Sequence, residues 1–478
     1  MAPTTQADDS STESQYTDHD LTNLWSNNPM SIDSQLGQIL RMSFWQILSM
    51  LSYKSTVFIN AFFLSLAGFY FHFETKENTI SIIKGIGLGN MIMNVLCFDV
   101  CLGMNGALET LISQAYGASK KANGSPAFQQ EMRLLCGKYL NLARLVNTVF
   151  MILPTVILFL FADEILITFF KQNAYISEIA IQYCIICIPG VWAMTQFDAT
   201  KRFLSAQQCG MIPVFTQYIT CVIQIVCCYI LVIQLQWGIL GISISTNITF
   251  VFNMVIQDLF ISLYAEDAFK DMWLGWGRTS LEGLGMFLEY AVPSAIIECS
   301  HWWALQLLVF LCGYDQLSGK NASQNFSSQT IILSLFTLTF MFPLGVSYSV
   351  SGMVGSHLGQ KKYEEALRYA NVGYACGMGL MALVCTILGY YSESIFRMFE
   401  TDPQQISKLK KCMWVILVII MLQASYGILA GVVKGLGLQN RASLITAICH
   451  FAIALPLAVF LGTSAVKFFN WQDREYLG

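Results

Sequence analysis

Several ionisable side chains lie inside long apolar stretches of this sequence, at Glu298, His301, Asp99 and Lys54. A charged group inside a membrane costs several kcal/mol, so each of them is a candidate functional residue. Glu298 and His301 are three residues apart and therefore share one face of a helix. A carboxylate shielded from water can bind a proton near neutral pH, and histidine titrates in the same range. The pair is a candidate proton-binding site, and the alternative is a static hydrogen-bonded packing pair.

The other buried charges allow simpler interpretations. Asp99 and Lys54 could form an ion pair that cancels both charges, or Asp99 could be a second coupling site. Asp198 lies close to Lys201 and Arg202 in the sequence. We therefore expect a local salt bridge at the membrane interface there.

The elements that must position these residues are membrane helices. The chain has 478 residues, of which 55% are hydrophobic and only 12% are charged. Soluble proteins carry roughly twice that share of charge, so lipid must cover much of the surface. Because backbone groups in lipid must be hydrogen-bonded within their own segment, the apolar segments are predicted to be helices. Eleven such segments are predicted, at residues 43–72, 82–106, 140–163, 175–197, 211–235, 238–264, 286–312, 328–352, 369–393, 411–433 and 443–465.

Composition also argues against several classes of ligand. The net charge of −4 and the lack of a basic stripe argue against a nucleic-acid partner. Most of the 15 cysteines lie in apolar segments, where cysteine acts as a small hydrophobic residue. Their spacing does not match a zinc site, and no Walker A sequence is present. We therefore expect no metal and no cofactor.

The distribution of Lys and Arg predicts the sidedness of the chain. The even-numbered loops are richer in these residues, which places them and the N-terminus in the cytoplasm. Residues 1–34 are polar and predict a disordered cytoplasmic tail. Glycosylation sequons at Asn321 and Asn325 then fall in an exterior loop.

An internal repeat divides the chain into two similar halves. The segment Gly103–Lys121 matches Gly345–Tyr363 in pattern, at an offset of 345 − 103 = 242 residues, and each copy ends near a glycine, Gly117 or Gly359. Residues 201–207 match residues 433–439 in the same way. Such repeats are typical of transporters with a binding site between the halves. We predict an N-lobe over 35–264, a cytoplasmic linker over 265–285 and a C-lobe over 286–478.

Four motifs resemble those of the multidrug and toxic compound extrusion (MATE) family, in its eukaryotic branch. They are LETLISQAYGA (108–118), AVPSAIIECSHWW (291–303), GMVGSHLGQKK (352–362) and AGVVKGLGLQ (430–439). The resemblance implies a V-shaped pair of six-helix lobes that exports cationic or amphipathic molecules against a proton or sodium gradient. It also implies a gating role, locking the ends of helices and loops, for the residues that match these motifs. These residues are Glu109, Thr110, Gln114, Gly117, Gly359, Lys434 and Gln439.

Two departures from the family pattern affect the prediction. The chain ends soon after the eleventh segment, so a twelfth helix is either missing or was altered by truncation or gene prediction. The acidic residues that the family carries in its C-lobe are also replaced, at His301, Gln306, Ser334 and Gln423. We expect Gln306, Ser334 and Gln423 to line the substrate cavity. Trp302 and Trp303 could hold an organic cation there, although aromatic residues also serve as membrane anchors.

The sequence therefore predicts a monomeric all-α membrane transporter of two six-helix bundles with 11–12 transmembrane helices. It would exchange a small organic substrate for a proton, or less readily a sodium ion, in a plasma or vacuolar membrane. One alternative is a lipid or metabolite flippase with weak or no ion coupling. A membrane-bound enzyme that uses His301 is a remote alternative, because a catalytic partner is not evident.

Overall fold

The computed structural model describes residues 32–70, 76–121, 124–163, 174–264, 269, 271–276, 281–312, 322–399 and 402–463. In these ranges all regular secondary structure is helical. The predicted tail lies outside them except for residues 32–34, which begin the first helix. Residues 464–478, on which the question of a twelfth helix rests, lie outside them as well.

The first half of the chain forms six long helical rods. The second rod runs through residues 76–119 in four consecutive helical pieces, and a π-helical turn in it directly precedes Asp99. Such turns inside α-helices are frequent at functional sites. The helical elements of all six rods are α2 (Ile32–Tyr70), α3 (Lys76–Met93), η1 (Asn94–Phe98), α4 (Asp99–Met104), α5 (Gly106–Ser119), α6 (Pro126–Asp163), α7 (Ala174–Ala206), α8 (Met211–Cys228), η3 (Tyr229–Gln234) and α9 (Gly238–Tyr264).

The second half repeats this plan with five rods and one short helix. Its last rod is again broken by a π-helical turn. The pieces are α10 (Leu284–Cys312), α12 (Ala322–Gly359), α13 (Tyr363–Tyr390), α14 (Ser392–Phe399), α15 (Pro403–Leu436), α16 (Gln439–Ala447), η5 (Ile448–Ala454) and α17 (Leu455–Thr463).

Each predicted segment falls on one of these rods. Within the described residues, nine helical stretches are long and apolar enough to cross a membrane. The two remaining rods, α2 and α10, have 39 and 29 residues. At ~1.5 Å per residue both exceed the ~30 Å of a hydrocarbon core. Large apolar side chains such as Phe62, Val222 and Leu422 are more than half exposed, as expected for a surface covered by lipid. The prediction of an all-α, multi-pass membrane protein is confirmed.

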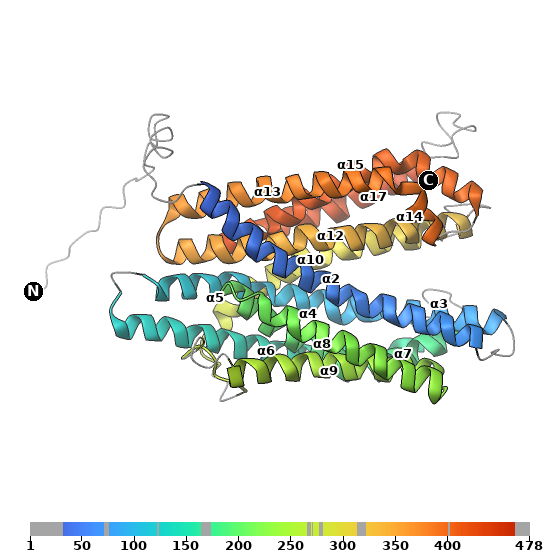
Figure 1. Cartoon of the computed structure of the whole chain (residues 1–478), viewed down its shortest axis with the longest axis horizontal. Helices are drawn as coiled ribbons and strands as arrows, with labels where there is room; N and C mark the ends of the chain where they lie inside the picture. The colour runs from blue at the N-terminus through green and yellow to red at the C-terminus, as the bar shows by residue number, and fades with distance from the viewer. Residues whose placement is uncertain are drawn as a thin grey trace, which may run out of the picture.

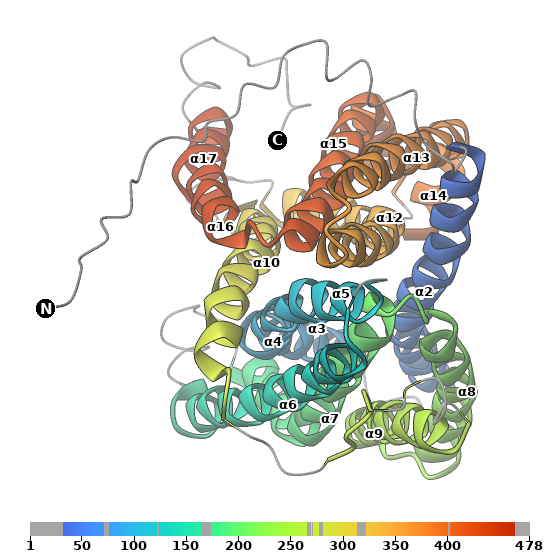
Figure 2. The same cartoon turned by 90° about the vertical axis from the view of Figure 1, so that its left-hand side faces the viewer.

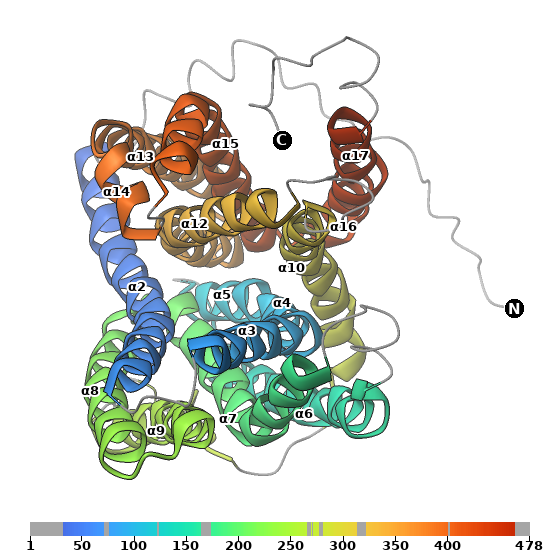
Figure 3. The same ribbon diagram turned by 90° about the vertical axis from the view of Figure 1, so that its right-hand side faces the viewer.

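The helices form two bundles, one from each half of the chain (Figure 1). Figures 2 and 3 view the molecule from its two ends: α12, α13, α15, α16 and α17 form one bundle, and α3 to α9 form the other. Helices α2 and α10 run between the bundles on opposite sides. The predicted N-lobe includes α2, yet Ile39 near its start packs with Val346 and Tyr369 of the second bundle. Further along α2, Ser49 donates to Gln217 of α8.

Candidate functional site

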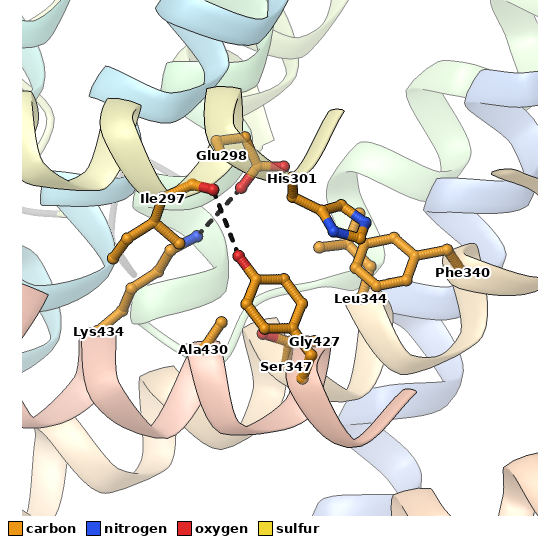
Figure 4. A pocket seen from close by; sticks show the side chains of 10 residues that line it. Ile297, Glu298, His301, Phe340, Leu344, Ser347, Gly427, Ala430 and Lys434 are labelled. Atoms are coloured by element: carbon orange, nitrogen blue, oxygen red, sulfur yellow. Dashed lines mark hydrogen bonds and ion pairs between the residues drawn. The ribbon is translucent and has the colours of Figure 1, made fainter. Parts of the chain in front are cut away.

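A pocket lies where α10, α12 and α15 meet (Figure 4). Its wall combines one carboxylate, one ammonium and several rings. The lining residues are Ile297, Glu298, His301, Phe340, Leu344, Ser347, Tyr426, Gly427, Ala430 and Lys434. Three of the sequence candidates therefore face the same pocket: Glu298 and His301, predicted for ion coupling, and Lys434, predicted for gating.

Helix α15 forms one wall of this pocket, and its ends and one glycine have clear sequence signals. Asp402 caps its N-terminus by accepting from the Gln404 N–H, and Gly437 ends it in the left-handed conformation, at φ 76°. Gly427 leaves room for a ring, because a Cβ there would lie 2.9 Å from Cε2 of Phe340. Tyr426 and Lys434 are eight residues apart and so lie on one face of the helix.

The Glu298 carboxylate is held from two sides. Its Oε1 accepts a hydrogen bond from Nε1 of Trp302 at 3.0 Å. Its Oε2 lies 3.7 Å from Nζ of Lys434 (Figure 4). The Glu298 side chain is 17% exposed and that of Lys434 only 3% exposed. A proton or a cationic ligand that enters the pocket can therefore reach the carboxylate more readily than the ammonium.

His301 sits in an aromatic cluster. Its ring centroid is 5.0 Å from those of Tyr426 and Phe340, 5.2 Å from Trp302 and 5.7 Å from His450. Its Nε2 is buried and has no hydrogen-bond partner within the described part of the chain. Among the described residues, His301 and Glu298 are not joined by a hydrogen bond, so the predicted packing pair is replaced by a ring stack beside a separately held carboxylate.

The other predicted cavity residues lie apart from this pocket. Trp302 packs on Phe340 at 5.5 Å and acts through its bond to Glu298. Ser334 is exposed, and its hydroxyl donates to the Thr330 carbonyl of its own helix. The remaining three candidates do not line the pocket: Trp303, Gln306 and Gln423.

The expected ion pair between Lys54 and Asp99 is wrong. Asp99 is 8% exposed, and its Oδ2 has no hydrogen-bond partner in the described ranges. No ion pair within 4 Å joins Lys54 to Asp99 in the part of the chain that the structure describes, and Nζ of Lys54 is 5.3 Å from the ring centroid of Tyr53. The two residues are too far apart to form an ion pair. Helix α2 packs mainly against α8 and α12 and not against α4, which carries Asp99.

Asp198 does form the local contacts that its neighbours suggested, with Lys201 at 3.2 Å and with Arg202 at 2.8 Å. All three side chains are at most 4% exposed, so the salt bridge is buried inside the protein and does not lie on its surface. Asn105 also donates to Asp198, at 3.0 Å. Water is excluded, so these charges depend on one another.

A chain of ion pairs runs from Asp198 to the pocket and crosses from one bundle to the other. Arg202 contacts Glu109, Glu109 lies 3.5 Å from Nζ of Lys434, and Lys434 reaches Glu298. We call these residues the six-charge chain: Asp198, Lys201, Arg202, Glu109, Lys434 and Glu298. It contains three cations and three carboxylates.

Hydrogen bonds between the family-like motifs join the bundles at the same level. Thr110 donates to the backbone carbonyl of Lys434, and Gln439 donates to the Thr110 hydroxyl. Gln114 donates to the Gly435 carbonyl at 3.1 Å. The candidates assigned to gating therefore meet across the bundle interface.

Helices α5 and α12 make a close, nearly symmetric contact further along. A Cβ on Gly117 would lie 2.0 Å from the Ser356 carbonyl oxygen, and a Cβ on Gly359 would lie 2.1 Å from that of Gln114. Residues 114 and 356 are related by the same offset of 242 as 117 and 359. The two copies of the repeat thus pack against each other about a pseudo-two-fold axis, and only glycine permits this approach.

Comparison with known proteins places the chain in a family. A family model described as MatE matches residues 81–230 and 293–460, which is more than half of the chain. The chain belongs to the MatE family. The match covers both halves of the repeat, and the resemblance of the four motifs is confirmed.

Curated relatives come from animals and plants. The chain is 27% identical over 381 residues to multidrug and toxin extrusion protein 2 of Oryctolagus cuniculus, covering 79% of this chain and 59% of the relative. It is 24% identical over 380 residues to protein DETOXIFICATION 30 of Arabidopsis thaliana, covering 80% of this chain and 72% of the relative. The chain thus spans about three fifths of the length of the rabbit relative.

Solved structures share the two-bundle fold. The crystal structure of the eukaryotic MATE transporter AtDTX14 matches with a TM-score of 0.78 at 19% identity, covering 91% of this chain and 90% of that one. A MOP superfamily transporter from Pyrococcus furiosus matches with a TM-score of 0.75 at 14% identity, covering 90% and 88%. At such identities the likeness establishes the fold.

Three aromatic residues of the site were missed as functional candidates by reasoning from sequence. Tyr426 and Phe340 line the pocket, and Tyr348 lies under Arg202, 5.0 Å from ring centroid to guanidinium. The spacing of Tyr426, Ala430 and Lys434 by four residues was a usable signal for one of them.

Proposed function

We propose that this MatE family protein is a secondary active transporter that exports organic cations or amphipathic molecules in exchange for protons. The observation that carries the proposal is the Glu298 carboxylate, partly open to a pocket walled by His301, Tyr426 and Phe340. Aromatic faces attract organic cations by up to ~2 kcal/mol when water is excluded. The carboxylate supplies the charge that either a proton or a cationic substrate would neutralise.

Protons fit this site better than sodium ions do. Hard metal cations take several oxygen ligands. Glu298 instead faces an indole N–H and an ammonium group, which leave little room for such a shell. Asp99, buried near the same bundle interface, is a second candidate for proton binding. Competition between proton and substrate for one charge would produce antiport by alternating access.

The proposal also covers the membrane location, the sidedness and the conformation of the protein. The protein would lie in a lipid bilayer as a monomer, with its N-terminus on the cytoplasmic side of a plasma or vacuolar membrane. The excess of Lys and Arg in the even-numbered loops supports this sidedness. The α5–α12 contact would then close the cytoplasmic side, leaving the pocket accessible from the other side. The chain would act as a transporter and not as an enzyme.

A flippase for lipids or metabolites is the second candidate. It is favoured by the neutral residues Ser334 and Gln423 at positions where the family carries acids, and by Lys434, which could hold a phosphate headgroup. Such a protein would move its substrate independently of an ion gradient.

Uptake of a fluorescent organic cation into proteoliposomes tests both candidates. Imposed pH and sodium gradients are applied separately. We expect uptake to follow the pH gradient and to be lost when Glu298→Gln and Asp99→Asn are combined. The matched control is Glu178→Gln, an exposed carboxylate at the start of α7. Undiminished uptake by the double variant would refute the proton site, and uptake indifferent to both gradients would favour the flippase.

A further inference from the structure

The six-charge chain is divided unequally between the two bundles. Asp198, Lys201, Arg202 and Glu109 belong to the first bundle, on α7 and α5. Lys434 and Glu298 belong to the second half of the chain, on α15 and α10. Within the six-charge chain, the ion pair that crosses the interface therefore joins Glu109 to Lys434, at 3.5 Å.

Lys434 is shared between two carboxylates. Its Nζ is 3.5 Å from Oε1 of Glu109 and 3.7 Å from Oε2 of Glu298. Both distances exceed those of a charge-assisted hydrogen bond, about 2.7–2.9 Å. The ammonium thus stands between the pocket and the bundle interface, and its side chain is 3% exposed.

The balance of charge in the chain depends on the state of Glu298. With Glu298 ionised, three cations face three carboxylates and the buried cluster is neutral. A proton on Glu298 leaves one positive charge uncompensated, and so does a monovalent organic cation bound beside it. An unbalanced charge away from water is strongly unfavourable. Separation of α5 from α15 would let water reach Lys434 and relieve that cost.

We propose that Lys434 is the positioning residue that couples the charge of the pocket to the bundle interface, so that the empty site keeps the bundles locked and a loaded site releases them. The lock rests on the proposed antiport at Glu298. A proton and an organic cation each add one positive charge, so either would release the lock. The empty transporter would stay closed, which is the condition for exchange without leak.

The surroundings of Glu298 contain further groups that contribute to its electrostatics. His301 lies on α10, Arg202 on α7 and Asp99 on α4. The phenols of Tyr426 on α15 and Tyr348 on α12 also face it. Of these residues only Arg202 belongs to the chain of ion pairs. Among the described residues, Lys434 is the one cation that lies within 4 Å of both Glu298 and Glu109.

Hydrogen–deuterium exchange of the full-length protein in lipid nanodiscs can test the lock. The measured segments are residues 106–119 of α5 and residues 352–362, which form the interface. All rates are compared after division by the intrinsic exchange rate of an unprotected amide at the same pH, because that rate itself rises with pH. On this corrected scale we expect slow exchange in alkaline buffer for the wild type and exchange about tenfold faster or more in acid. Glu298→Gln should exchange fast at every pH, because Lys434 is then unbalanced throughout.

Lys434→Met gives the sharpest prediction. Its cluster carries an extra negative charge when Glu298 is ionised and is neutral when Glu298 is protonated. The pH response of the interface should therefore be inverted, with faster exchange in alkaline buffer. Combining Lys434→Met with Glu298→Gln restores neutrality and should give slow exchange at every pH. Lys434→Arg keeps the charge and should behave as the wild type.

The outcomes separate the lock from the proposed function. If Lys434→Met keeps the wild-type pH response, or if the double variant exchanges as fast as Glu298→Gln alone, the lock is refuted. Suppose that the wild type transports no organic cation, while Lys434→Met still shows the inverted pH response. That result would refute the proposed substrate class and would support the lock. The restored protection of the double variant also excludes misfolding as the cause of fast exchange.

Discussion

Replacing Gly117 by alanine should open the contact between α5 and α12. The new Cβ would lie 2.0 Å from the Ser356 carbonyl oxygen, whereas real Cβ atoms essentially never come closer than 3.0 Å. The helices must therefore separate by at least 3.0 − 2.0 = 1.0 Å. The obstacle is backbone, so rotation of a side chain cannot relieve it.

The size of the effect follows from the cost of overpacking. Inserting a methyl group into a well-packed contact costs about 1–3 kcal/mol. If that cost falls on the closed state alone, the closed-to-open ratio drops by about 5- to 150-fold. The higher helix propensity of alanine is the same in both states and cancels from this ratio. Gly359→Ala should act alike, because its Cβ would lie 2.1 Å from the Gln114 oxygen.

The assay compares hydrogen exchange in residues 106–119 with the rate of cation leak from proteoliposomes. Gly379→Ala on α13 is the matched control, because a Cβ there meets nothing within 4 Å. In Gly117→Ala we expect faster hydrogen exchange and passage of the organic cation that is not coupled to proton exchange. We expect neither change in the control. Wild-type exchange and leak in Gly117→Ala would refute the tight contact and the closed state inferred from it.

Three further predictions concern other parts of the molecule. Arg144→Gln should lower the free energy of unfolding by about 3–5 kcal/mol in denaturant titrations, because Asp258 would lose a buried partner at 3.0 Å. Lys410 and then Arg397 donate to Glu393 and hold the pKa of this carboxyl below its usual range. That contribution to stability is present at neutral pH and is lost as the pH falls through the lowered value, so the Tm of Lys410→Gln and of the wild type should converge in acid. Tyr426→Leu should weaken binding of an organic cation by several-fold in equilibrium titrations, with unchanged affinity arguing against the aromatic wall.

Much of the fold could be predicted from the sequence because the bilayer leaves few choices. A segment that spans lipid must be helical, and its length is set by the thickness of the hydrocarbon. The eleven predicted segments therefore fall on observed helices. The repeat was also visible, because Gly117 and Gly359 are 242 residues apart and each is followed within four residues by a pair of lysines.

The path of α2 could not be predicted in this way. Hydropathy indicates whether a helix lies in an apolar environment, but it does not indicate which bundle the helix packs against. The hydroxyl of Ser49 meets Gln217 of the first bundle, and Ile39 meets Val346 of the second. Both contacts are far apart in sequence.

The sequence by itself identified which ionisable residues are candidates for the membrane interior, because Glu298, His301, Asp99 and Lys54 lie in apolar segments, whereas Lys434 falls just outside the predicted segment 411–433. Only the tertiary structure decided which of them meet. Lys54 failed to pair with Asp99, and Lys434 reached Glu298 and Glu109 from a helix more than a hundred residues away from either. Coulomb energy depends on distance in space, and the packing of helices sets that distance.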